Sequence, residues 1–174
     1  MRRRGVWPMP LLAEHGLSVL IEVRSGDQEQ VILLDTSMSA KALLHNFEVL
    51  GLDGGRVESI VLSHGHLDHT GGLVGFLYAF PRPRDLVVHP GAFAPRRLNI
   101  PGKGPGEPMA ALEAADLTAR GVTLRTPRLA ATWHSDLVLT LGEIDRVTSF
   151  EKGFPWAEIE AGGNWGADGF ADDQ

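Results

Sequence analysis

The sequence predicts a mixed α/β domain in which helices lie on a sheet, and three local patterns lead to that prediction. Residues 17–24 and 31–35 are apolar runs joined through a Ser-Gly-Asp turn, which indicates two neighbouring antiparallel strands. Residues 40–50 place apolar side chains on one helical face, between a serine and a glycine that suit helix caps. Residues 57–62 form a β-branched apolar run that is typical of a buried strand.

The following residues continue the alternation of helices and strands. A short apolar helix is expected over residues 73–80 because Pro81 ends it, and another helix over residues 109–120. Further strands are expected at residues 86–89, 122–124 and 137–141. Residues 99–108 contain three glycines and three prolines, so we expect an irregular loop of the kind that often borders a binding site.

Length and composition indicate one domain. The 174 residues are 43% hydrophobic, which is enough for one core and too short for two comfortable domains. We expect the domain to occupy residues 1–154. Residues 155–174 are rich in glycine and aspartate without apolar periodicity, so we expect a tail with little fixed structure.

Several classes of function are disfavoured by composition. The net charge of −6, without clusters of basic residues, gives no support for nucleic-acid binding. The absence of cysteine excludes disulfides and thiolate ligands. The chain starts with three arginines at positions 2–4, but Pro8, Pro10 and Glu14 interrupt the apolar run that a signal peptide or membrane span needs, so we expect a cytoplasmic protein without a membrane partner.

Four candidate metal ligands follow the strand at residues 57–62: His64, His66, Asp68 and His69. In an extended chain, alternate side chains point to the same side, so His64 and His66 are able to coordinate one ion together. A turn after them would bring Asp68 and His69 toward a neighbouring ion, and Gly65 would leave room beside the ions. Imidazole and carboxylate ligands suit zinc above all, with iron or manganese as alternatives, and we expect one or two ions.

These four ligands do not complete two metal sites. Catalytic zinc usually has three protein ligands, whereas two per ion are available here. His89, at the end of a predicted strand, is expected to line the site and contact substrate, with direct metal ligation or a purely structural role as alternatives, and His134 is a weaker candidate for a third ligand. His15 either flanks the pocket or bonds a neighbouring carbonyl, and Asp35 is expected to hydrogen-bond the metal-binding loop rather than to touch an ion.

The order of these elements, together with the HxHxDH motif, resembles the metallo-β-lactamase fold, an αββα sandwich, and mainly its N-terminal half. The resemblance is strongest to the branch typified by 7,8-dihydropterin-6-methyl-4-(ribofuranosyl)aminobenzene-5'-phosphate synthase. The matching stretches are residues 14–18 (EHGLS), 32–36 (ILLDT), 62–73 (LSHGHLDHTGGL), 89–90 (HP) and 142–146 (GEIDR). Ser37 and Asp145 depart from the branch pattern, which usually has glycine and proline there.

Members of this branch continue into a second half that supplies further histidines, whereas no histidine follows His134 here. The resemblance therefore implies a C-terminally truncated chain, whose open sheet face would be covered by a missing segment or by a second copy in a homodimer.

The expected function is that of a metal-dependent hydrolase acting on a small molecule. Metal-bound hydroxide would attack an ester, phosphoester or amide-like centre, and Asp68 would orient the water and accept its proton. The resemblance implies an alternative, a pterin-related synthase or transferase. A further alternative is a truncated, non-catalytic fragment with an incomplete metal site.

Overall fold

A computed structural model describes residues 9–151 and 153–173, and the three arginines near the start of the chain lie outside this range. Its main elements in chain order are β1 (Val19–Ser25), β2 (Gln28–Leu34), α1 (Ala40–Leu50), η1 (Gly54–Arg56), β3 (Ser59–Val61), α2 (Leu67–Thr70), α3 (Leu73–Ala79), β4 (Arg84–Val87), η2 (Pro90–Phe93), β5 (Arg96–Ile100), β6 (Gly104–Pro105), α4 (Ala114–Ala119), β7 (Val122–Arg125), β8 (Leu129–Trp133), β9 (Val138–Gly142), β10 (Ala157–Ala161) and β11 (Asn164–Ala167).

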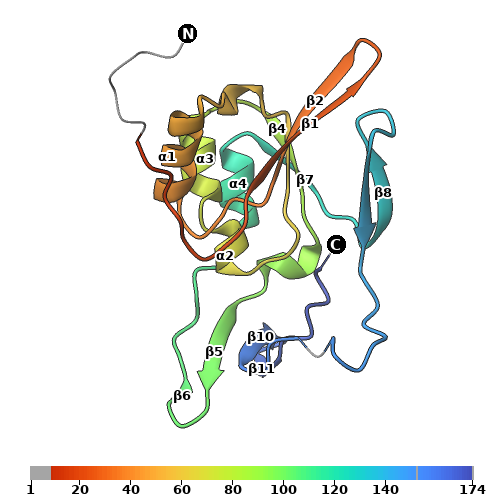
Figure 1. Ribbon diagram of the computed structural model, residues 1–174. Coiled ribbons are helices and arrows are strands. Elements are labelled where there is room, and N and C mark those ends of the chain that lie inside the picture. Colours follow the sequence, from red (N-terminus) through yellow and green to blue (C-terminus); the bar gives the residue numbers. More distant parts are fainter. Residues whose placement is uncertain (1–8, 152, 174) are drawn as a thin grey trace.

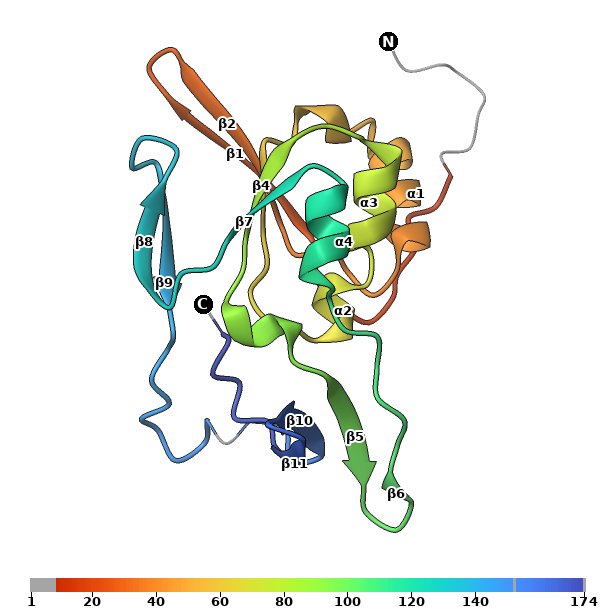
Figure 2. The same ribbon diagram turned by 180° about the vertical axis from the view of Figure 1, so that it is seen from behind.

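A five-stranded sheet in the order β1-β2-β3-β4-β7 is the centre of the structure. Strand β1 runs antiparallel to β2, as expected for a hairpin, and β2, β3, β4 and β7 run parallel to one another. Helices α1, α3 and α4 cover one face of this sheet, and the β8–β9 hairpin lies on the other side (Figures 1 and 2). Because β2, β3 and β4 are parallel, the residues that follow them meet at one edge of the sheet.

Both faces of the sheet are buried. In β2, Val31 and Leu33 belong to the core cluster under the helices, whereas Ile32 belongs to a second cluster on the opposite face. Trp133 and Val138 of the β8–β9 hairpin pack against this second cluster. Burial on both sides explains why the central strands are continuous apolar runs in the sequence rather than alternating ones. The mixed α/β prediction is therefore confirmed.

The segment from residue 155 onward differs from the tail that we expected. Strands β10 and β11 form an antiparallel hairpin, and β10 also pairs with β5. The two residues between them, Gly162 and Gly163, both have positive φ values, 59° and 82°, which a two-residue hairpin turn requires. The sequence signal for this hairpin was the Gly-Gly pair between two short stretches in which apolar and polar residues alternate. The high aspartate content of the segment obscured it.

Two other predicted boundaries are wrong. Residues 99–108 are not an irregular loop throughout, because β5 and β6 form a short hairpin within them. The helix predicted over residues 109–120 is shorter, since α4 begins at Ala114. The backbone N–H of Met109 donates to the carbonyl of Arg96 at 2.8 Å, which keeps this stretch extended beside β5. None of the helices within the described residues has both the length and the apolar character needed to cross a bilayer.

Replacement of Phe76 by alanine tests the core under the helices. Phe76 is fully buried on α3 and contacts the rings of Phe47 and Phe80 at centroid distances of 5.5 and 5.1 Å. We expect Phe76→Ala to lower the free energy of unfolding by about 3–5 kcal/mol in a urea titration. Tyr78, on the same helix but 82% exposed, is the matched control, and Tyr78→Ala should change it by less than about 0.5 kcal/mol. Equal losses would contradict this packing.

Candidate metal centre

The four predicted ligands lie on the loop that joins β3 to α3, which we call the histidine loop (residues 63–70). His64 and His66 follow the end of β3, and Asp68 and His69 lie in the single turn of α2. The loop is fastened to the segment after β2 by backbone hydrogen bonds, from Asp35 N to Val61 O at 2.8 Å and from Thr36 N to His69 O at 2.7 Å. The carboxyl ends of β2 and β3 thus build one edge together.

The structure brings these side chains together. The ring centroid of His64 lies 4.8 Å from that of His66 and 4.1 Å from that of His69. Asp68 Oδ2 lies 3.5 Å from His69 Nε2. The four side chains therefore form one cluster.

Each histidine of the cluster engages one ring nitrogen with an oxygen acceptor. His64 Nδ1 lies 2.9 Å from Ser63 Oγ and 3.3 Å from Asp173 Oδ1. His69 Nδ1 lies 2.7 Å from Asp35 Oδ2, and His66 Nε2 lies 3.3 Å from Asp168 Oδ2. A neutral imidazole that donates through one nitrogen carries a lone pair on the other, which is the form that ligates metals.

Asp35 holds the loop from beneath. It is completely buried, and its carboxylate accepts hydrogen bonds from Ser63 N, Ser63 Oγ and His69 Nδ1 at 2.7–2.8 Å. Its backbone has φ 56°, a left-handed conformation that few residues other than glycine adopt and that aspartate tolerates better than most. The expectation that Asp35 hydrogen-bonds the loop is confirmed.

The environments of His64 and His69 shift their pKa values in opposite directions. The hydrogen bond to Asp35 is the main cause that raises the pKa of His69, with the Asp68 and Asp173 charges adding to it. Burial lowers the pKa of His64, and the neighbouring His69 and His66 lower it further. The surroundings therefore favour the neutral form of His64 more strongly than that of His69.

The donor set suits a divalent cation in kind but is not a formed site. Among the described residues, no three His, Asp or Glu side chains are already arranged to hold one metal ion. His66 Nδ1, however, is buried without a hydrogen-bond partner in this part of the chain. A buried imidazole nitrogen with a lone pair is costly unless something binds it, and a metal ion satisfies that requirement.

Asp68 and His15 form the solvent side of the cluster. His15 Nε2 lies 3.1 Å from Asp68 Oδ2, and the His15 side chain is 83% exposed. His15 therefore flanks the predicted metal ligands, which was one of its two expected positions. Asp68 is placed between an exposed and a largely buried imidazole, His15 and His69.

The other two histidine candidates have partners of their own. His89 is buried, its Nδ1 accepts from Gly91 N at 3.0 Å, and its Nε2 lies 2.9 Å from Glu143 Oε1. This hydrogen bond holds the pKa of Glu143 below its usual value. With both ring nitrogens engaged, the predicted contact of His89 with substrate stays a prediction. His134 bonds Ser59 Oγ at 2.9 Å instead of joining the cluster.

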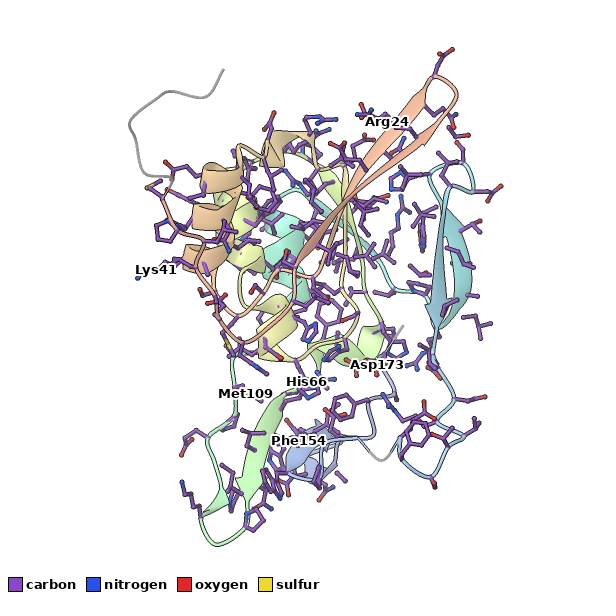
Figure 3. The ribbon with its side chains drawn as sticks, in the orientation of Figure 1. Arg24, Lys41, His66, Met109, Phe154 and Asp173 are labelled. Carbon is purple, nitrogen blue, oxygen red and sulfur yellow. The ribbon has the colours of Figure 1, made fainter. Side chains whose placement is uncertain are left out.

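Sequence reasoning missed a group of charged residues around the histidine loop: Arg96, Asp168, Asp172 and Asp173. Arg96 is buried, which its local sequence does not indicate. The aspartates belong to the stretch that we expected to lack structure, and Figure 3 labels His66 and Asp173 where this stretch meets the loop. The sequence shows that residues 155–174 are rich in aspartate, but not that these aspartates lie beside the histidine loop.

Comparison with known proteins adds the family. The profile of the metallo-beta-lactamase superfamily matches residues 12–148. The chain belongs to the metallo-beta-lactamase superfamily. Its HxHxDH loop and the sheet edge that carries it lie within the matched residues.

The chain is also similar to two known proteins. It is 39% identical over 84 residues to 7,8-dihydropterin-6-methyl-4-(beta-D-ribofuranosyl)-aminobenzene-5'-phosphate synthase of Methanocaldococcus jannaschii, a match covering 48% of this chain and 29% of that protein. The crystal structure of Tm1679, a metal-dependent hydrolase of the beta-lactamase superfamily, superimposes with a TM-score of 0.60 at 23% identity. That superposition covers 92% of this chain and 52% of that one. The chain thus spans about half or less of these relatives, and the predicted metallo-β-lactamase-like fold is confirmed.

Replacement of Asp35 by alanine tests its hold on the loop. The change leaves the Ser63 and His69 hydrogen-bond donors without an acceptor in a largely buried site, so we expect the free energy of unfolding to fall by about 3–5 kcal/mol. Asp53 offers a control, because it accepts a hydrogen bond from Gly55 N at 2.8 Å but is exposed. Asp53→Ala should cost about 1 kcal/mol in the same denaturation measurement. A smaller loss for Asp35→Ala than for Asp53→Ala would contradict the role of Asp35.

Proposed function

We propose that this chain is a metal-dependent hydrolase that acts on an ester, phosphoester or amide-like bond of a small molecule. The observation that carries the proposal is the cluster of three imidazoles and Asp68 at the carboxyl edge of the parallel strands, in which the buried His66 Nδ1 has no hydrogen-bond partner among the described residues. Superfamily membership supports it, since members of this superfamily use divalent metals.

His64 and His66 would hold one divalent cation, and Asp68 and His69 would hold or border a second. Zinc is the ion we propose, because imidazole and carboxylate ligands suit it and no thiolate is available. When bound, such a cation lowers the pKa of water and stabilises negative charge on a substrate oxygen. With two ligands from this loop per ion, affinity should be weaker than at a catalytic zinc site with three protein ligands.

The residues around the ions have separate tasks in this proposal. Asp68 orients the attacking water and accepts its proton, and His15, at 3.1 Å from its carboxylate, offers a path for that proton to solvent. Asp35 fixes the His69 ring, so that its Nε2 faces Asp68. Serine 63 connects these groups, because its hydroxyl donates to Asp35 and lies beside His64.

A second candidate function is a pterin-related synthase or transferase step. The 39% identity to the Methanocaldococcus jannaschii synthase over 84 residues favours it, although the match spans 29% of that protein. The two candidates differ in whether water is consumed. A chain that neither binds metal nor turns over substrate would instead fit the non-catalytic alternative.

Zinc titration of the purified chain tests the metal proposal. We expect isothermal calorimetry to detect zinc binding in the wild-type chain. His66→Ala should raise the zinc dissociation constant by about tenfold or more, because it removes a ligand. The control is His45→Ala: His45 lies on α1 and its Nε2 bonds the Pro10 carbonyl oxygen at 2.8 Å. It should leave zinc affinity unchanged. Absence of binding at micromolar zinc would remove the proposal.

Hydrolysis of p-nitrophenyl acetate and of bis-p-nitrophenyl phosphate tests the activity. We expect chelation to abolish turnover and added zinc to restore it, and Asp68→Asn to lower kcat by about 100-fold or more, because it removes the proton acceptor. Turnover in isotopically labelled water with an added alcohol as acceptor separates the candidates, since hydrolysis places the label in the released acid, whereas transfer moves the acyl or phosphoryl group to the alcohol without label. Unlabelled product would favour the transferase.

A further inference from the structure

Arg96, the first residue of β5, is a buried cation with two carboxylate partners. Its Nε donates to Asp168 Oδ2 at 2.9 Å, and one terminal nitrogen donates to Asp172 Oδ2 at 2.7 Å. The side chains of all three residues are at most 3% exposed. Carbonyl oxygens of Ala92 and Ala94 accept from its other terminal nitrogen at 3.4 and 3.2 Å. The guanidinium is therefore fixed in position and orientation.

Both carboxylates also touch the histidine loop. Asp168 Oδ2, the oxygen bonded by Arg96, lies 3.3 Å from His66 Nε2, and Asp172 Oδ2 accepts from Gly65 N at 2.7 Å. Gly65 itself leaves space for the arginine: a Cβ there would lie 2.4 Å from Arg96 Nη1 and 2.5 Å from the Ala92 carbonyl oxygen. The room beside Gly65 that we expected to serve the ions is thus occupied by Arg96.

We propose that Asp168, held by Arg96, is a positioning residue that fixes the His66 ring with Nε2 protonated and Nδ1 free to ligate metal, while Asp172 fixes the loop backbone at Gly65. This inference rests on the proposed metal-binding function. Neither Arg96 nor the two aspartates would touch the ion, and all three act through the loop.

The geometry around His66 supports this role in two ways. A carboxylate that accepts from one nitrogen of a ligating histidine fixes its tautomer and raises its basicity, and loss of such a partner typically weakens metal binding about 10–100-fold. Phe170 packs against the same ring, with a centroid distance of 4.7 Å, which restricts its rotation.

Asp168 lies between the Arg96 guanidinium and the His66 ring. Burial by itself would raise the pKa of Asp168, but hydrogen bonds from His66 and from the Phe170 N–H, together with the Arg96 charge, outweigh burial and hold it well below its usual value. Arg96 compensates a charge that would otherwise be expensive to bury beside an imidazole.

Zinc binding by Asp168→Asn tests the proposal. Asparagine keeps the size of the side chain but removes the charge, so we expect the zinc dissociation constant from calorimetry to rise about 10–100-fold. Arg96→Lys is the second variant, because a single ammonium cannot reproduce the two directed bonds to Asp168 and Asp172, and we expect a rise of at least about threefold. The matched control is Arg97→Gln, which removes the neighbouring ion pair of Arg97 with Glu158 at 2.7 Å and should leave affinity unchanged.

A second readout would not respond to a merely structural role. Nitrogen NMR of the imidazoles in the metal-free wild-type chain at mildly alkaline pH should show His66 as the Nε2–H tautomer, and Asp168→Asn should give a mixture of tautomers. An Nδ1–H tautomer in the wild-type chain would overturn the inference even if neither variant folds.

The outcomes separate the two proposals. Absence of zinc binding by the wild-type chain overturns the proposed function, and the NMR result then still decides whether Asp168 fixes the ring. Zinc binding by the wild-type chain, with an affinity within twofold in a folded Asp168→Asn variant, overturns this inference and leaves the proposed function standing.

Discussion

The parallel pairing of β2, β3 and β4 is the constraint on which the site depends. Parallel strands deliver their carboxyl ends to one edge, so the residues after β2 and β3 meet although they are far apart in the sequence. Asp35 converts this meeting into a fixed geometry, because its buried carboxylate accepts three hydrogen bonds from Ser63 and His69. An anion buried at that position requires these donors, just as the loop requires the anion.

Three carboxylates from outside the histidine loop surround the cluster, and each of these three faces a different imidazole. Asp35 faces His69, Asp168 faces His66 and Asp173 faces His64. Each carboxylate fixes the orientation of its imidazole ring and determines which ring nitrogen carries the proton. Metal-ligating histidines require such partners. The negative charge of the surroundings also favours a cation at the cluster, in agreement with the cation-dependent chemistry of the superfamily.

The sequence predicted the parts of the fold that are encoded locally. The first hairpin, helix α1 with its Ser39 cap and Gly51 end, and the loop of closely spaced histidines were accessible because each pattern lies within a few residues. The role of Asp35 was also accessible, because it is the last residue of a predicted strand. Arg96 and Asp168 were not, since their pairing joins positions 72 residues apart and depends on β5 pairing with β10. The high glycine and aspartate content of residues 155–174 obscured the β10–β11 hairpin. Met109 is kept extended by its hydrogen bond to the Arg96 carbonyl, which the pattern of apolar residues does not indicate.

The hydrogen bond from Gly65 N to Asp172 spans 107 residues of chain. Closing a loop of that length is entropically unfavourable before the contacts that reward it exist, so such contacts form late in folding. During synthesis the strands, the helices and the histidine segment all emerge before Asp168 and Asp172, which contact His66 and Gly65. The cluster would therefore pass through a period in which its rings are near one another but not yet aligned, and the last residues of the described chain would set the moment at which the site acquires its geometry.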